Sequence, residues 1–150
     1  MRFRRSVFLV AETPVVYAFH ENLQNIIKVM PPGTRVRQIK GKVPARPGET
    51  FFFEVAQFMV PLRWEGRWEV AEFPERLVDV SRTFPFATWR HEHRFESQPG
   101  GTRMTDTVDY EVPWYLGGPV TAATFFRVLF AWMFMVRHRR TRGYFLQNRN

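Results

Sequence analysis

Between Thr34 and Val112 one segment after another alternates between apolar and charged residues, which is the pattern of half-buried β-strands. The segment from Leu62 to Val70 is the clearest case. Its Leu, Trp and Val side chains lie on one side, and Arg and Glu lie on the other. Because successive side chains of a strand point to opposite faces, one face of the predicted sheet is wet and the other is covered.

The order of the predicted elements follows from this alternation and from the turn residues between segments. We expect strands at about 2–11, 34–43, 49–60, 62–73, 77–84, 89–96 and 102–112, two short helices at about 13–21 and 22–30, and a final helix that ends near Phe145. Thr13 is expected to cap the first helix, with Pro14 at its first position. Ser97 to Gly101 is a strong hairpin signal. The sequence therefore predicts one α+β domain over 1–150, with an antiparallel meander of about six or seven strands.

The composition describes a globular chain with a bulky interior. Of 150 residues, 45% are apolar and 17% are aromatic, which is enough to build a substantial core. There is no cysteine, so disulfides, thiol nucleophiles and Cys-ligated zinc are excluded. The lack of cysteine fits a cytoplasmic location.

The net charge of +8 comes almost wholly from arginine. Its densest cluster follows the apolar segment Val120 to Val136, and comprises Arg137, Arg139, Arg140 and Arg142. That apolar segment is interrupted by Arg127 and is shorter than the ~20 residues of a membrane span, so we expect an amphipathic helix. Elsewhere Arg alternates with Glu, as on a solvated sheet face, and we do not expect nucleic-acid binding. Peripheral membrane contact through the four arginines stays open, as does the oligomeric state.

The stretch WRHEHRFE, residues 89–96, places two histidines on the covered face of the sheet. Its charged residues point to water, so Trp89, His91, His93 and Phe95 point inward. If Glu96 pairs with Arg103 across the hairpin, His93 faces Asp106 on the next strand. A shift by two residues would pair His91 with Asp106 instead.

A buried carboxylate needs a partner, and an imidazole supplies one. Four interpretations of His91, His93 and Asp106 remain open from the sequence. In the first, a histidine and Asp106 form a pair that satisfies itself and only supports the sheet. In the second, His91, His93, Asp106 and Tyr110 orient a ligand in an apolar pocket. A histidine is a general acid or base whose tautomer Asp106 fixes, or the two histidines and Asp106 are metal ligands. We expect no bound metal and no cofactor.

The phrase from Leu77 to Pro113 resembles the bacterial SRPBCC proteins of the polyketide cyclase/dehydrase type, within the START and Bet v 1-like superfamily. The matching elements are Asp79, Pro85-Phe86, Trp89, His91, His93, Gly100-Gly101 and Thr105-Asp106. The segment ETPVVYAFHENLQNI also looks like the opening of that family, so the resemblance covers essentially the whole chain. It implies a helix-grip fold, in which a curved sheet and a long carboxy-terminal helix enclose an apolar cavity. No recognisable catalytic motif accompanies it.

Two functions are compatible with these residues. The first is binding of a hydrophobic or aromatic small molecule, such as a lipid, polyketide or terpenoid-like compound. The residues expected to line the cavity are Trp64, Trp68, Trp89, His91, His93, Phe95, Asp106, Tyr110, Phe125 and Trp132. The alternative is a cyclase or dehydratase that uses His91 or His93 with Asp106 for proton transfer. His20 and His138 lie on predicted helices and are expected at the surface.

Overall fold

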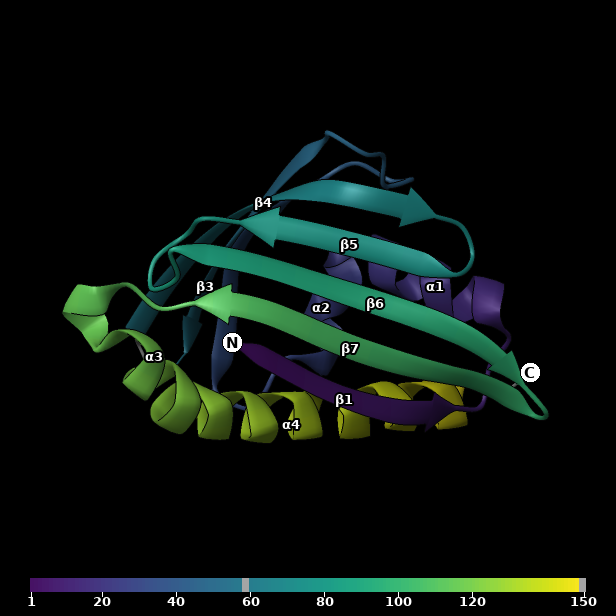
Figure 1. Ribbon diagram of the computed structural model, residues 1–150. Coiled ribbons are helices and arrows are strands. Elements are labelled where there is room, and N and C mark those ends of the chain that lie inside the picture. The colour runs from purple at the N-terminus through teal and green to yellow at the C-terminus, as the bar shows by residue number, and fades with distance from the viewer. Residues whose placement is uncertain (58–59, 149–150) are drawn as a thin grey trace.

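A computed structural model describes residues 1–57 and 60–148 of the chain, and it contains a seven-stranded antiparallel sheet (Figure 1). The strands are β1 (Arg2–Leu9), β2 (Thr34–Lys40), β3 (Thr50–Gln57), β4 (Val60–Glu72), β5 (Arg76–Ser81), β6 (Thr88–Gln98) and β7 (Gly101–Glu111). Their order in the sheet is β1-β7-β6-β5-β4-β3-β2, so the last six strands follow one another as the predicted meander. The first strand, β1, pairs with β7 and forms that edge of the sheet.

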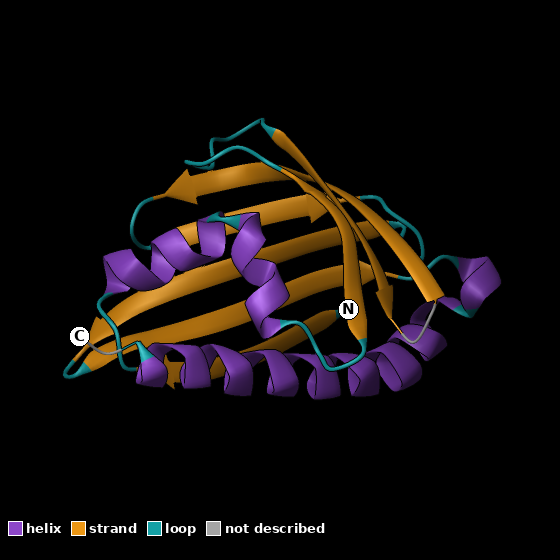
Figure 2. Cartoon of the chain, turned by 180° about the vertical axis from the view of Figure 1, so that it is seen from behind, coloured by secondary structure: helices purple, strands orange, loops and turns teal. Residues whose placement is uncertain are grey.

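The helices lie on one face of this sheet, as Figure 2 shows. They are α1 (Thr13–Glu21), η1 (Leu23–Asn25), α2 (Ile26–Val29), η2 (Trp114–Leu116), α3 (Gly118–Thr121), the π segment η3 (Ala122–Phe126) and α4 (Arg127–Gln147). The long helix α4 runs along β1 and contacts α2. The core lies between these helices and the inner face of the sheet. The predicted α+β class and helix-grip arrangement are confirmed.

The hairpin between β6 and β7 has the register expected from its charges. Glu96 faces Arg103, Phe95 faces Met104 and His93 faces Asp106. The inward direction of the alternate β6 side chains is also confirmed, because each of them is buried. The charge pattern of two strands and a Pro-Gly-Gly turn was therefore sufficient to place a histidine opposite a carboxylate.

Two threonines differ from expectation. Thr105 shares one side of β7 with the charged Arg103 and Asp109, for which charge alternation predicts contact with water, but it is buried because β1 lies beside it and Ser6 Oγ is 2.9 Å from Thr105 Oγ1. Thr13 was expected to cap the first helix. Glu12 is the N-cap residue instead, and Thr13 Oγ1 lies 3.1 Å from Thr102 Oγ1 in the interior. In both places a contact with a strand distant in the sequence, β1 for Thr105 and β7 for Thr13, decides where the side chain lies.

The inward face of the final helix is shifted from the one predicted. Residues Phe126, Phe130 and Phe134 are buried at a spacing of four, whereas Phe125 is 61% exposed and Trp132 is 40% exposed. Trp132 lies two positions from both Phe130 and Phe134, and so points away from the core. The expectation that Phe125 and Trp132 line the interior is therefore wrong. The π segment that ends at Phe126 sets the start of the buried stripe.

The stripe predicts which residues of α4 stabilise the fold. Phe134 has no exposed surface, so Phe134→Ala should lower the free energy of unfolding by about 3–5 kcal/mol. Val128 is 70% exposed on the same helix, and Val128→Ala should change it by no more than about 0.5 kcal/mol. Urea unfolding of both variants measures the difference. Equal losses would contradict the observed orientation of the helix.

Candidate functional site

The carboxylate of Asp106 is surrounded by three histidines in the interior. Its Oδ1 atom lies 2.8 Å from His91 Nε2 and 2.6 Å from His93 Nδ1, and its Oδ2 atom lies 2.5 Å from His138 Nε2. Only 1% of Asp106 is exposed. Two of the imidazoles come from β6 and the third comes from α4, so the cluster joins the sheet to the helix.

A second buried carboxylate extends the cluster on the other side of His91. Asp79 Oδ1 on β5 lies 3.6 Å from His91 Nδ1, and Asp79 Oδ2 accepts a hydrogen bond from Trp89 Nε1 at 3.2 Å. His91 thus lies between two carboxylates and faces each with a different ring nitrogen. An imidazolium has a proton on both nitrogens and matches this arrangement.

The fourth histidine of the chain also joins this region. The His20 ring lies 5.2 Å from the His93 ring between centroids, and His20 Nδ1 lies 2.7 Å from the Val16 carbonyl oxygen. His20 is half-buried and His138 is buried, so the expectation that both lie at the surface is wrong. Phe130, Phe134 and His138 are four residues apart, and this spacing was the signal that identifies His138 as an inward residue.

These contacts move the pKa values in opposite directions. Burial disfavours the charged form of His91, but the hydrogen bonds to Asp106 and Asp79 outweigh it and raise the pKa of His91. Burial and the neighbouring His91 lower the pKa of His93. For Asp106, burial opposes ionisation, yet the surrounding histidines hold its pKa well below the usual range. Burial and His93 lower the pKa of His20 to about 3.

The other half of the interior is aromatic. It lies toward the start of α4, and Tyr110 on β7 donates a hydrogen bond from its hydroxyl to the Ala122 carbonyl oxygen of the π segment at 2.7 Å. The rings that meet here are Trp64, Phe86, Trp89, Tyr110, Phe126 and Phe130. We call the five other than Phe86 the aromatic box. They come from β4, β6, β7, the π segment and α4.

Phe86 occupies the aromatic box from a loop. It belongs to the connection between β5 and β6, yet it is buried. Its ring centroid lies 5.0 Å from that of Phe126, 5.1 Å from Trp89 and 5.8 Å from Phe130. Residues on connecting loops usually lie at the surface. A single loop side chain therefore fills the space between the sheet and the helix at this end.

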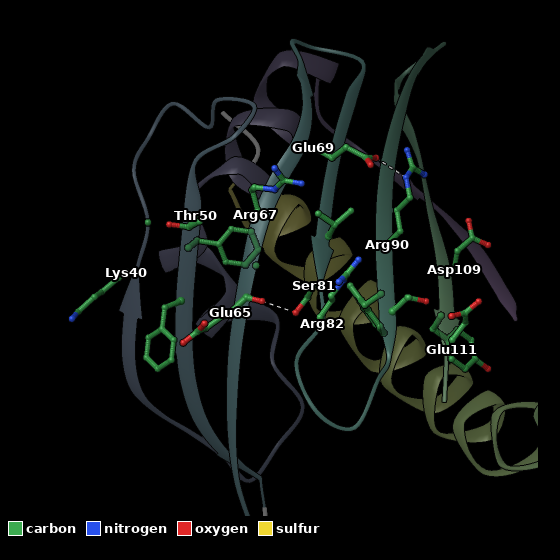
Figure 3. A pocket seen from close by; sticks show the side chains of 18 of the residues that line it. Lys40, Thr50, Glu65, Arg67, Glu69, Ser81, Arg82, Arg90, Asp109 and Glu111 are labelled. Carbon is green, nitrogen blue, oxygen red and sulfur yellow. Dashed lines mark hydrogen bonds and ion pairs between the residues drawn. The ribbon is translucent and has the colours of Figure 1, made fainter. Parts of the chain in front are cut away.

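A hollow of about 1600 Å³ lies on the opposite, outer face of the sheet (Figure 3). The side chains labelled in Figure 3 are mostly charged. Ion pairs form among the lining residues: Arg90 Nε lies 2.6 Å from Glu69 Oε2, and Arg2 Nε lies 2.7 Å from Asp109 Oδ1. Paired charges of both signs are typical of a solvated sheet face. This is the wet face that charge alternation predicted.

One part of the cluster has the composition of a metal site. One ligand atom each from Asp79, His91 and His93 lie within 4.8 Å of one another. Imidazole and carboxylate are ligands of Zn²⁺ and Fe²⁺. Asp106, which contacts both His91 and His93, would then orient the two rings from behind. The expectation that no metal or cofactor binds remains a prediction.

The predicted site residues fall into two groups in the structure. Those brought together on the inner face and buried are Trp64, Trp68, Trp89, His91, His93, Phe95, Asp106 and Tyr110. Phe125 and Trp132 are outside this group. Phe86, Asp79 and His138 are the residues that the predicted site lacked. The sequence indicated Phe86 only through the family resemblance, because no periodic pattern assigns a loop residue to a core.

No family model matches the sequence, and no curated protein matches it significantly. Solved structures with a similar fold include a protein from Nitrosomonas europaea, at 14% identity and a TM-score of 0.76 over 99% of this chain and 96% of that one. An AHSA1-like protein from Aeromonas hydrophila matches at 16% identity and a TM-score of 0.70, over 100% and 98% of the two chains. The di-domain ARO/CYC BexL from the BE-7585A biosynthetic pathway matches at 18% identity and a TM-score of 0.75, over 100% of this chain and 51% of that one.

At these identities the likeness shows the fold. The chain shares a helix-grip fold with these structures, and the resemblance stated from the sequence agrees with them at the level of the fold. Because one such fold supports many activities, the function has to be argued from the side chains.

Removal of the central carboxylate tests whether the cluster is a charged network. Asp106→Asn leaves buried positive charge without its partner and should lower the free energy of unfolding by about 3–5 kcal/mol. Asp109→Asn is the matched control on the same strand. It breaks an exposed pair with Arg2, for which a loss of at most about 1 kcal/mol is expected. Similar losses from the two substitutions, measured by urea unfolding, would show that Asp106 is not a charged centre.

The pKa directions also predict how stability depends on pH. His20 and His93 have lowered pKa values in the folded state, so below pH of about 6.5 the unfolded chain binds more protons. Stability should therefore decrease as the pH falls from about 6.5 toward 4, by at most about 1.4 kcal/mol per pH unit for each of the two histidines. His91 acts oppositely: its raised pKa adds stability that is complete below about 6.5 and is lost as the pH rises through the folded value.

Replacement of His20 isolates one part of this dependence. His20→Gln should make the decline of stability below pH of about 6.5 shallower, because one of the two histidines that resist protonation is gone. Urea unfolding of the wild type and the variant across this range provides the measurement. A slope that is the same in both proteins would contradict the low pKa of His20.

Proposed function

We propose that the protein binds a small hydrophobic molecule with an aromatic or other planar ring between the sheet and the carboxy-terminal helix. The observation that carries the proposal is the burial of Phe86, a loop residue, within the aromatic box. A set of rings that surrounds one loop-borne phenyl group also suits the planar ring of a ligand. The ligand ring would take the place of Phe86 when the loop moves outward.

The connection that carries Phe86 is short, and its other phenylalanine is outside the core. Phe84 is exposed, and the loop follows β5, whose last residue, Ser81, is hydrogen-bonded to the neighbouring strand through the Glu65 carbonyl oxygen. Displacement of Phe86 thus requires movement of a few loop residues and leaves the strand pairs intact. Loops that move are typical of binding sites on a rigid scaffold.

The histidine cluster would define the polar end of the site. Phe134 lies between the two halves of the interior, with its ring 5.4 Å from His91 and 6.5 Å from Phe130 between centroids. A ligand whose ring fills the aromatic box would extend toward His91. A few polar groups at the end of an apolar pocket fix the orientation of a ligand. The ARO/CYC BexL, from a biosynthetic pathway, has the same fold, which is compatible with a small-molecule site in this position.

The alternative function, proton transfer by His91 or His93 with Asp106, has less support. Both histidines are buried and contact Asp106 directly, and aromatic rings such as Trp89, Phe95 and Phe134 surround them. A general acid or base has to reach the proton that it transfers, either directly or through one water molecule. An enclosed cluster whose histidines contact one buried carboxylate is better suited to orient a ligand or to hold the helix.

Truncation of Phe86 provides the test. Phe86→Ala empties the aromatic box, and engineered apolar cavities of this kind take up small aromatic molecules. We expect N-phenylnaphthylamine, an apolar fluorescent probe, to bind the wild type saturably. The variant should bind it about tenfold more tightly or better, because no side chain has to be displaced.

Phe84→Ala is the matched control, since it removes an exposed phenyl ring from the same loop. It should leave the affinity for the probe unchanged within about twofold. If Phe86→Ala is too unstable, Phe86→Leu tests the same point with a smaller cavity, and a thermal melt identifies folded protein. Absence of saturable binding to the wild type and to both Phe86 variants would refute the proposed function.

A further inference from the structure

The outward face of the carboxy-terminal helix is apolar over much of its length. Its outward residues follow a spacing of three and four, and we call them the outer helix face: Phe125, Val128, Trp132, Met135, Arg139 and Arg142. The helical run Gly118–Gln147 has a mean hydropathy of 1.6 over its most apolar 18 residues, and only 22% of that window is buried. By length and composition alone it is sufficient to span a membrane.

Two further aromatic residues are exposed directly before this helix. Trp114 is 87% exposed, and Tyr115 is also exposed, both in η2. Scattered apolar side chains are normal on a protein surface, but a continuous apolar stripe with several aromatics marks an interaction surface. Figure 1 shows that α3 and α4 continue along the length of the molecule, so this surface is long as well as apolar.

The charges beside this surface all have one sign. From residue 112 to residue 148 the chain has five arginines and no acidic residue: Arg127, Arg137, Arg139, Arg140 and Arg142. Arg139 and Arg142 continue the outer helix face beyond its apolar part. An apolar stripe followed by arginines on one helix face matches a lipid bilayer, which has an apolar interior and can have anionic headgroups at its surface.

We propose that the outer helix face docks on the surface of a membrane that contains anionic lipids. Phe125, Val128 and Trp132 enter the boundary between acyl chains and headgroups, while Arg139 and Arg142 bind lipid phosphates. Trp and Tyr favour this boundary because they are apolar with one polar atom. The helix lies on the membrane and does not cross it, because its opposite face, with Phe130, Phe134 and His138, is held in the core.

A lipid surface fits this face better than a second copy of the chain does. In a two-fold dimer the same surface would meet itself, so the arginines of each helix would face apolar residues or other arginines. No carboxylate in residues 112–148 is available to pair with them. Burial of unpaired guanidinium groups is costly, whereas an anionic bilayer supplies a phosphate for each of them. This inference does not depend on the proposed ligand.

Co-sedimentation of the full chain with vesicles tests the proposal. We expect binding to vesicles of phosphatidylcholine and phosphatidylglycerol, weaker binding to phosphatidylcholine alone, and release at high salt. The triple variant Arg139→Gln, Arg140→Gln and Arg142→Gln should bind about a hundredfold less tightly. The double variant Phe125→Ser and Val128→Ser should also lose binding. All five positions are exposed, so both variants should fold.

Matched controls change the same kinds of residue elsewhere. Arg63, Arg67 and Arg94 are exposed on the outer sheet face, and their replacement by Gln gives the same net charge as the helix variant. Phe73→Ser removes an exposed phenyl ring from the turn between β4 and β5. Neither control should reduce vesicle binding more than about twofold. The fluorescence of Trp114 and Trp132 gives an independent measure of vesicle binding. Their emission should shift to shorter wavelength on vesicles, and their replacement by Phe should abolish the shift.

Two results would overturn the proposal. The first is a wild-type protein that does not bind the anionic vesicles, or whose binding is the same in the helix variants and in the controls. The second is a dimer in solution that the Phe125→Ser and Val128→Ser variant converts to a monomer, with no vesicle binding by either form. That second result would assign the outer helix face to self-association.

Discussion

The structure depends on one buried carboxylate. Asp106 contacts His91 and His93 of the neighbouring strand and His138 of the carboxy-terminal helix. A charge in this position destabilises a core unless its partners are in place, and loss of one partner is then expensive. The cluster therefore fixes both the register of the central hairpin and the position of the helix on the sheet. All four histidines of the chain gather in this region.

This polar centre divides the interior. At one end, three imidazoles contact the Asp106 carboxylate between the sheet and α4. At the other end, the aromatic box lies against the start of the same helix, with Phe86 inside it. The proposed ligand occupies the second half, because a loop side chain can leave it while the histidine cluster keeps the helix in place. In the first half the histidines His91, His93 and His138 are enclosed and contact Asp106 directly.

Much of this arrangement was predictable because charge alternation is a strong signal. It identified the inner face of β6, and the Glu96 and Arg103 pair then gave the register that places His93 opposite Asp106. The orientation of the helix was not evident from its apolar residues taken together, since they surround it on several sides. Its outward Phe125 and Trp132 were assigned to the interior, and its inward His138 to the surface. The stripe of Phe126, Phe130 and Phe134 would have corrected both assignments. Phe86 lies in a loop, where no period indicates which side chain returns to the core.

A double-mutant cycle between Asp106 and His138 is the most direct test of the account. It compares the free energies of unfolding of the wild type, Asp106→Asn, His138→Gln and the double variant. If the pair joins the helix to the sheet, the coupling energy should be about 1–3 kcal/mol. A coupling energy below about 0.5 kcal/mol would mean that the two side chains act independently and that Asp106 does not hold the helix.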